Sequence, residues 1–325
     1  MPRGRLLAIV GPTAVGKSEV AVEVARIIDG EIVSADSMQV YRGLDIGTGK
    51  LSPAERGGVP HHLLDVVEPE ETYSVARYER EALAAIAAIH RRGRVPLLVG
   101  GTGLYYRAVV RDYLFEGPGA DPELRARLAD EAQREGAPAL HRRLAEIDPV
   151  AAGRIHPNDL RRIIRALEVY ILSGVPLSQQ QQGSEEPRFD LVAVGLTAPR
   201  GVLYARIERR VDAMLAKGLL AEVRTLVDRG LESWLTSIQA LGYKEFLPYL
   251  RGEEDLATAV VRLKRETRRY AKRQLTWFRR EPHVHWLDRE AYPGTGNLVA
   301  AILRLAEQAW GTPGPGGRGR EVGMQ

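Results

Sequence analysis

The chain has 325 residues, a net charge of +4, a pI near 9.3 and no cysteine. The lack of cysteine excludes disulfides, thiolate metal sites and cysteine nucleophiles, and no apolar stretch is long enough to span a bilayer. The length predicts an α/β core with an inserted or second domain. Since the first strand begins within ten residues of the N-terminus, we expect no signal peptide. The chain is therefore expected to be cytoplasmic, without membrane association or an obligate protein partner.

The first predicted unit is a strand over residues 6–10, a loop over residues 11–18 and an amphipathic helix up to about residue 28. The loop reads GPTAVGKS and meets every fixed position of the phosphate-binding pattern G-x-x-x-x-G-K-[ST], which is typical of ATP-binding and other nucleotide-binding proteins. Its glycines let backbone N–H groups turn inward, and the following helix adds the positive end of its dipole. We expect these eight residues to bind a diphosphate or nucleotide phosphate: Gly11, Pro12, Thr13, Ala14, Val15, Gly16, Lys17 and Ser18.

The side chains of this loop supply charge and a metal ligand. Lys17 provides a positive charge for the phosphate, and the Ser18 hydroxyl is placed to reach a bound Mg²⁺. A second strand over residues 31–36 and a third over residues 94–99 are predicted next. Since ligands bind at the carboxyl ends of parallel strands, Asp36 and the glycine turn at residues 100–103 are expected beside the loop. Residues 43–58 are rich in turn formers and predict a mobile loop that carries Lys50.

The central part of the chain changes in character. Residues 117–187 predict arginine-rich helical pieces punctuated by prolines, with no convincing strand. We expect a core domain over residues 1–115 and 188–310, an inserted helical domain over residues 116–187, and a disordered tail over residues 311–325. The most charged inserted piece, residues 158–168, is compatible with either a solvated helix face or a nucleic-acid contact.

After the insertion, a strand over residues 191–196 resumes the core, and helices follow over residues 202–218 and 219–229. Arg206 and Arg210 stand four residues apart and share a helix face. A long basic helix is predicted over residues 262–280, with Glu266 as its only acid. This unbalanced face favours phosphate binding in a nucleic acid over a merely solvated helix. Its cations are Arg262, Arg265, Arg269, Lys272 and Arg273.

Three classes of chemistry fit a phosphate loop: NTP hydrolysis, small-molecule phosphorylation, and transfer with a diphosphate leaving group. The strand at residues 97–99 ends in glycines rather than in a magnesium-binding acid, which disfavours hydrolysis. Asp36 is then the available carboxylate, either as a metal ligand or as a base for an incoming nucleophile. Two basic helical segments favour a polyanionic substrate, although a small-molecule or nucleoside kinase stays an alternative.

Five segments in order carry a resemblance to a known family: GPTAVGKS at residue 11, SADSMQVYRGLDIGT at residue 34, LVGGTGLY at residue 98, RIIRALEV at residue 162 and YAKRQLTWFR at residue 270. The chain resembles the bacterial tRNA dimethylallyltransferases over residues 6–287. This resemblance implies a P-loop NTPase-like parallel sheet flanked by helices, with an inserted all-helical domain that helps bind the anticodon stem-loop. It also implies transfer of a dimethylallyl group from dimethylallyl diphosphate to the exocyclic amine of the adenosine 3′ of the anticodon, with Mg²⁺ as cofactor.

The resemblance assigns roles to individual residues. Asp36 is expected to act as the general base, and Thr13 and Arg210, or Arg206 in place of Arg210, are expected to stabilise the departing diphosphate with Lys17. Gln39 and Thr102 are expected to position a flipped nucleotide. The residues expected at the tRNA are Asp36, Ser37, Met38, Gln39, Thr102, Leu124, Arg161, Arg162, Ile163, Ile164, Arg165, Ala240, Leu241, Gly242, Tyr243, Lys244, Glu245, Lys272, Arg273, Gln274, Leu275, Thr276, Trp277, Phe278 and Arg279.

Overall fold

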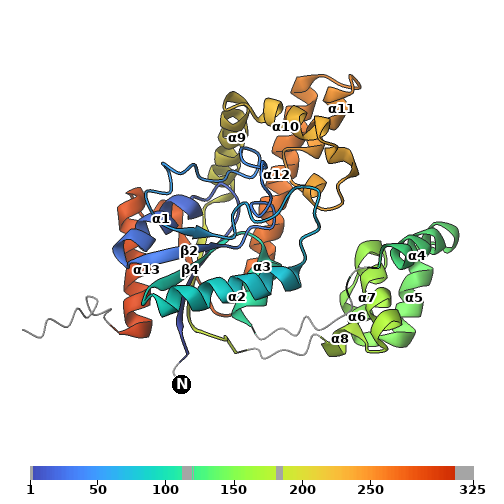
Figure 1. The fold of residues 1–325 in the computed structure, drawn as a ribbon, viewed down its shortest axis with the longest axis horizontal. Coiled ribbons are helices and arrows are strands. Elements are labelled where there is room, and N and C mark those ends of the chain that lie inside the picture. Colours follow the sequence, from blue (N-terminus) through green and yellow to red (C-terminus); the bar gives the residue numbers. More distant parts are fainter. Residues whose placement is uncertain (1–2, 112–118, 120, 181–185, 312–325) are drawn as a thin grey trace, which may run out of the picture. The chain divides into compact units, whose positions relative to one another are not determined.

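A computed structural model describes residues 3–111, 119, 121–180 and 186–311 (Figure 1). Its centre is a six-stranded sheet in the order β3-β2-β4-β1-β5-β6, and every neighbouring pair of strands is parallel. The predicted α/β class with a parallel sheet is confirmed. The tail from residue 312 onward lies outside the described residues. The strands are β1 (Arg5–Val10), β2 (Gly30–Ser34), β3 (His61–His62), β4 (Val95–Gly100), β5 (Asp190–Thr197) and β6 (Val284–Asp288).

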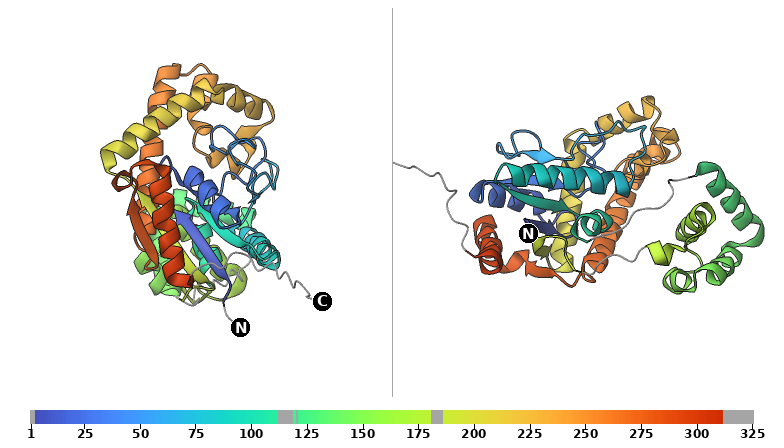
Figure 2. Two further views of the ribbon diagram at one scale, coloured as in Figure 1. Left: turned by 90° about the vertical axis from the view of Figure 1, so that its left-hand side faces the viewer. Right: turned by 60° about the horizontal axis from the view of Figure 1, so that its bottom comes forward.

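Apolar side chains alternate between the two faces of the sheet, and helices cover both faces. Leu6, Ala8 and Val10 of β1 belong to a core shared with helices α2 (Val75–Arg91) and α3 (Gly103–Val110), whereas Leu7 and Ile9 pack with α1 (Lys17–Ile27) and α13 (Gly294–Trp310). In the left view of Figure 2, α13 and α2 lie on opposite sides of the strands. Burial on both faces explains why the central strands are continuous apolar runs rather than alternating sequences.

The remaining helices follow β5 or lie in a separate unit. After β5 come α9 (Arg200–Ala216), α10 (Leu219–Asp228), α11 (Leu247–Leu250) and α12 (Leu256–Phe278), with 3₁₀ turns η1 (Leu231–Ser233), η2 (Ser237–Gln239), η3 (Lys244–Phe246) and η4 (Arg289–Ala291). No described helix is both long and apolar enough to cross a membrane. The separate unit holds α4 (Pro122–Glu135), α5 (Ala137–Ile147), α6 (Pro149–Arg154), α7 (Leu160–Ser173) and α8 (Leu177–Gln180).

Contacts between residues divide the chain into residues 1–110 with 188–325 and residues 111–187. The smaller unit has its own core, built around Leu128, Leu144 and Leu167. Its helices α4, α6 and α7 begin at carboxylate caps: Asp121, Asp148 and Asp159 each accept a hydrogen bond from a backbone N–H in the first turn. The unit thus has the apolar centre and the helix signals of an independent helical bundle.

Candidate active site

A cavity of about 440 Å³ lies at the carboxyl ends of β1, β2 and β4. Its walls come from the loop after β1, the segment after β2, and helices α9 and α12, as expected for a parallel sheet. It therefore brings together segments from both ends of the larger unit. Its lining includes Thr13, Lys17, Ser18, Asp36, Gln39, Arg210, Tyr270, Arg273 and Gln274.

The loop over residues 11–18 takes a shape that only glycine permits at two positions. Gly11 has φ of 139°, and a Cβ there would lie 2.4 Å from the Leu196 carbonyl oxygen. Gly16 has φ of 94° directly before α1. The Lys17 ammonium donates to the Pro12 carbonyl at 2.7 Å, so the loop folds around this side chain. The backbone geometry matches the phosphate-binding loop predicted from the sequence.

Gln274 joins this loop to the end of β4. Its Oε1 accepts a hydrogen bond from the Thr13 N–H at 2.9 Å, and its Nε2 donates to the Gly101 carbonyl at 2.9 Å. A Cβ on Gly101 would lie 2.1 Å from Nε2, so the amide fits only against glycine. This buried residue of α12 thus sets the distance between two ligand-facing turns.

Two cations face the cavity beside Asp36. Burial lowers the pKa of Lys17 to about 7, an effect that the Asp36 charge opposes and the Arg210 charge increases. Burial also lowers the pKa of Arg210, again opposed by Asp36. Both cations lose hydration here, so an anion entering the cavity gains strong electrostatic attraction. Arg206, the alternative to Arg210, instead donates to Glu290 at 2.7 Å and does not line the cavity.

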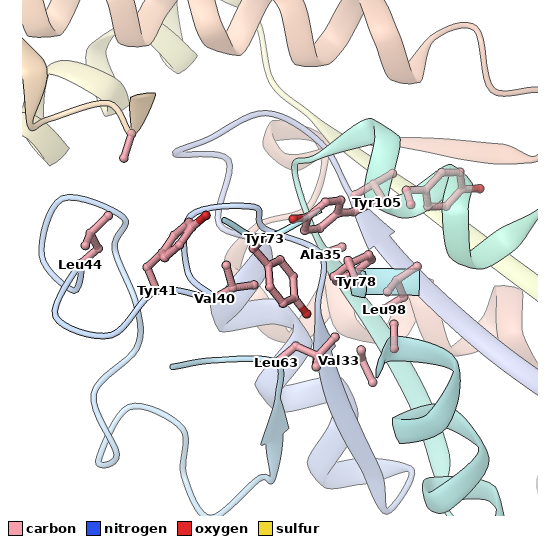
Figure 3. Packing of buried hydrophobic residues seen from close by; sticks show 14 of the residues in the cluster. Val33, Ala35, Val40, Tyr41, Leu44, Leu63, Tyr73, Tyr78, Leu98 and Tyr105 are labelled. Atoms are coloured by element: carbon pink, nitrogen blue, oxygen red, sulfur yellow. The ribbon is translucent and has the colours of Figure 1, made fainter. Parts of the chain in front are cut away.

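The segment that carries Asp36 is held in place by three hydrogen bonds. Asp36 accepts from the Met38 N–H at 2.9 Å, and Thr102 Oγ1 accepts from the Ser37 N–H at 3.0 Å. Beneath it, the Tyr78 hydroxyl donates to the carbonyl of Ser34, the last residue of β2, at 3.0 Å. Figure 3 shows Tyr78 among buried residues that include Tyr73, Tyr105 and Leu98. This packed support holds the Asp36 backbone in one position.

Thr102 supports the neighbouring segment rather than lining the cavity itself. The residues after Asp36 do line it, and Gln39 Nε2 donates to the Thr48 carbonyl at 3.3 Å. Residues 43–58 were predicted as a mobile loop, and the structure corrects this. Lys50 is almost fully buried and donates to the Tyr41 carbonyl and to Asp65, each at 2.5 Å.

The chain is similar to known proteins over most of its length. Residues 39–281 match the IPP transferase family. The chain is 53% identical over 306 residues to a tRNA dimethylallyltransferase of Symbiobacterium thermophilum, covering 94% of this chain and 96% of the relative. A relative of the same name in Desulforudis audaxviator is 54% identical over 304 residues, covering 93% and 98%. This chain belongs to the IPP transferase family.

Solved structures of the family have the same fold. The full-length tRNA isopentenylpyrophosphate transferase from Bacillus halodurans is 46% identical with a TM-score of 0.69, covering 94% of this chain and 98% of that one. A eukaryotic dimethylallyltransferase acting on tRNA is 32% identical with a TM-score of 0.72, covering 88% and 74%. The conserved fold in these solved relatives supports a P-loop-like arrangement of the sheet and loop in this IPP transferase family member.

The charges of α12 are more balanced than the sequence suggested. Arg262 pairs with Glu254, Lys264 with Asp212 of α9, and Arg268 with Glu208 of α9, while Arg265 and Arg269 share Glu266. Glu266 is the only acid of residues 262–280. Because acids of α9 and of the preceding loop also pair with this helix, its charge is less unbalanced than predicted. Among the described residues, four cations near the end of α12 form no ion pair: Lys272, Arg273, Arg279 and Arg280.

Several side chains expected at the tRNA are buried in the protein. Their contact with tRNA stays a prediction, and three of them, Ala240, Gly242 and Gln274, line the cavity. Phe278 contacts Tyr106 edge to face with ring centroids 5.6 Å apart. Gln274 joins the two turns described above. The buried residues are Leu124, Ile163, Ala240, Gly242, Tyr243, Glu245, Gln274 and Phe278.

The smaller unit presents its arginines unequally. Arg165 donates to the buried carboxylate of Glu168 at 2.6 Å, and Arg125 binds the same carboxylate through two hydrogen bonds. Arg162 lies 3.4 Å from Asp159 within its own helix, whereas Arg161 is exposed and makes no ion pair with any described residue. The predicted cluster therefore contains structural as well as available charges.

Sequence reasoning did not identify Glu222, Thr48 or Tyr270 as site residues. Tyr270 lines the cavity, where burial and the Asp36 charge raise its pKa. Glu222 belongs to no sequence motif, and the backbone N–H groups of residues 45–47 that it binds lie more than 170 residues away in the chain. The closely spaced Gly47 and Gly49 were the available signal, because a tight turn at a ligand edge needs such residues.

Proposed function

We propose that the protein is a tRNA dimethylallyltransferase. The bond between the allylic carbon and the diphosphate oxygen of dimethylallyl diphosphate breaks, and a bond forms from that carbon to the exocyclic amine of an adenosine 3′ of the anticodon. The amine loses one proton and diphosphate leaves. One observation carries this proposal: the cavity holds a phosphate-binding loop and a carboxylate, Asp36, on the same lining surface.

Several cavity residues have a part in this reaction. The exocyclic amine is a weak nucleophile, so removal of its proton by Asp36 as the new bond forms lowers the barrier. Negative charge develops on the departing diphosphate, and loop N–H groups, Thr13, Lys17 and Arg210 stabilise that charge. Gln39 lines the same cavity and is placed to contact the base after it leaves its stack.

The residues present fit a Mg²⁺ ion of the kind that is bound mainly by phosphate oxygens and water. Ser18 contributes a hydroxyl beside the phosphate loop, and Asp36 lines the same cavity. In the described part of the chain, no cluster of three or more His, Cys, Asp or Glu side chains forms a complete metal cage. When bound, the ion would withdraw negative charge from the diphosphate.

The polyanionic substrate distinguishes this proposal from a small-molecule kinase. The unpaired cations at the end of α12 and the exposed Arg161 are of the kind that contacts RNA phosphates, whereas a small acceptor needs neither. A tRNA-modifying enzyme of this kind would work in the cytoplasm.

Incubation of the purified protein with unmodified tRNA and dimethylallyl diphosphate tests the proposal. We expect release of diphosphate and a prenylated adenosine in nuclease digests examined by mass spectrometry. Asp36→Asn should lower the rate by roughly a hundred- to ten-thousand-fold with little loss of tRNA affinity. Asp29→Asn is the matched control, because Asp29 precedes the same strand and is 80% exposed. Phosphoryl transfer from ATP to a small acceptor, without prenylation, would favour the kinase instead.

A further inference from the structure

Glu222 of α10 binds the backbone of a loop that lines the cavity. Its Oε2 accepts from the N–H groups of Asp45 at 3.2 Å and Ile46 at 2.8 Å, and its Oε1 accepts from Gly47 at 3.1 Å. The Tyr243 hydroxyl donates to Oε1 at 2.8 Å. Three successive N–H groups that converge in this way form a concave anion site, which the carboxylate fills.

The surroundings of this contact leave the loop little freedom. Gly47 lies against the Tyr243 ring, and a Cβ at Gly47 would come within 2.7 Å of the Tyr243 hydroxyl oxygen. The N–H of Gly49 donates to the Ile46 carbonyl at 3.0 Å, so the turn closes on itself directly after the residues that Glu222 holds. A shift of the carboxylate would therefore move the whole turn.

The same turn contacts two cavity side chains. The Thr48 carbonyl accepts from Gln39 Nε2 at 3.3 Å and from Arg210 Nη2 at 3.5 Å. Gly49, with φ of 65°, lies so close to Arg210 that a Cβ would stand 1.9 Å from Nη2. The backbone of residues 48–49 therefore packs directly against the Arg210 guanidinium.

We propose that Glu222 is a positioning residue for group transfer, acting through residues 45–49 on Arg210 and Gln39. This inference rests on the proposed function, in which Arg210 meets the departing diphosphate. Glu222 holds the turn in place, and the turn fixes the Arg210 guanidinium in the position where it meets the departing diphosphate. A displacement of about 1 Å at such a group is enough to lower a rate about a hundredfold.

The first test uses Glu222→Gln, which keeps the size of the side chain but removes its charge and one acceptor oxygen. We expect kcat to fall by about ten- to a hundredfold and inorganic diphosphate to bind about tenfold more weakly. Binding of tRNA should change by less than about twofold, since Glu222 faces backbone rather than the RNA-contacting cations. Asp228→Asn, at the exposed end of the same helix, is the control and should match the wild type.

A second measurement reports on the loop itself. Hydrogen exchange of a peptide covering residues 43–50 should become at least about tenfold faster in Glu222→Gln, with other regions unchanged. Tyr243→Phe, which removes only the phenol donor, should give a smaller change in the same direction. Unchanged exchange in Glu222→Gln would overturn the inference.

A double-variant cycle tests whether Glu222 acts on diphosphate binding through Arg210. In an Arg210→Ala background, Glu222→Gln should weaken diphosphate binding by no more than about twofold, because its target is already absent. Full additivity would overturn the inference, as would wild-type diphosphate affinity in Glu222→Gln. Diphosphate binding is measured without any prenyl transfer. If the wild type binds diphosphate but never forms prenyladenosine, the proposed function fails while the inference about Glu222 is still decided.

Discussion

The basic segment over residues 262–280 of α12 and its C-terminal end has two halves that look alike in sequence but differ in what their cations meet. In the first half, Lys264 and Arg268 pair with carboxylates of α9. In the second half, Lys272 and Arg273 form no ion pair with any described residue. Gln274, which follows them and bonds to the phosphate loop, is buried. A count of arginines therefore measures the charge that a helix carries, not the charge available to a partner.

The largest effect is expected where the second half meets the phosphate loop. Gln274→Leu leaves the Thr13 N–H and the Gly101 carbonyl without their partners, so the free energy of unfolding should fall by about 1–3 kcal/mol. The loop would also lose its fixed distance from β4, and kcat should fall by about a hundredfold. Denaturant titration and steady-state kinetics measure the two effects.

Gln274→Glu sharpens this prediction because it keeps an acceptor for Thr13 but faces the Gly101 carbonyl with a second oxygen. We expect this variant to be less active than the wild type and more active than Gln274→Leu. A Gln274→Leu variant with wild-type kcat would show that α12 does not set the geometry of the loop.

The contrast between the halves is tested directly by two triple variants of equal charge change. Replacing Lys272, Arg273 and Arg279 by Gln should flatten the dependence of log Kd for tRNA on log salt by about 0.7–0.9 per lost phosphate contact. Folding should not change, since none of the three forms an ion pair within the described structure.

The matched triple replaces Lys264, Arg265 and Arg268 by Gln on the same helix. This change should leave the salt dependence unaltered and lower the free energy of unfolding by up to about 1 kcal/mol per pair. Equal salt slopes for both triple variants would mean that the ion pairs of the first half open when tRNA binds.

Local signals explain which parts of this molecule were predictable. The phosphate loop, the strand before Asp36 and the parallel sheet class all follow from spacing within a few residues, and the structure confirms the sheet. Strands β3 and β6 escaped prediction because one has only two residues and the other, VHWLD, mixes polar and apolar side chains. Their pairing depends on a neighbouring strand rather than on their own sequence.

The rest of the candidate site depends on contacts between distant residues. Gln274 meets Thr13 across 261 positions, and Glu222 meets Ile46 across 176. Nothing in the sequence around either partner encodes such a contact. The same reason explains why acids of α9 were not anticipated beside α12.

The difference seen along α12 recurs within one turn of α7, with smaller expected effects. Arg165→Gln removes one of two arginines from buried Glu168, so the free energy of unfolding should fall by about 1–3 kcal/mol. Arg161→Gln should leave stability unchanged and flatten the salt dependence of tRNA binding by at most about 0.7–0.9. Thermal denaturation and binding titrations separate the two, and a reversal of these signatures would contradict the assignment.

Lys17 extends the comparison to a cation that is buried rather than paired or exposed. Its pKa is lowered to about 7, so it is largely neutral at pH 8, whereas a bound diphosphate favours the charged form. Diphosphate binding at pH 8 should therefore take up close to about one proton, and binding at pH 6 close to none. Affinity is then highest below pH 7 and falls as the pH rises above it, by at most about tenfold per unit.

Calorimetry of inorganic diphosphate binding in two buffers of different ionisation enthalpy measures this proton. Lys17→Arg is the reference, since a guanidinium stays charged at both pH values and diphosphate's own protonation affects both proteins alike. The difference in proton uptake between the wild type and Lys17→Arg should therefore be near one at pH 8 and near zero at pH 6.

In the free protein, the folding stability depends on pH in the opposite direction to the diphosphate affinity. The folded pKa lies below the unfolded value of 10.5, so the contribution of Lys17 to stability grows as the pH rises from about 7. Equal proton uptake by the two proteins at pH 8 would mean that Lys17 stays charged despite its burial, with Asp36 acting as its partner in the way that α9 acids serve the first half of α12.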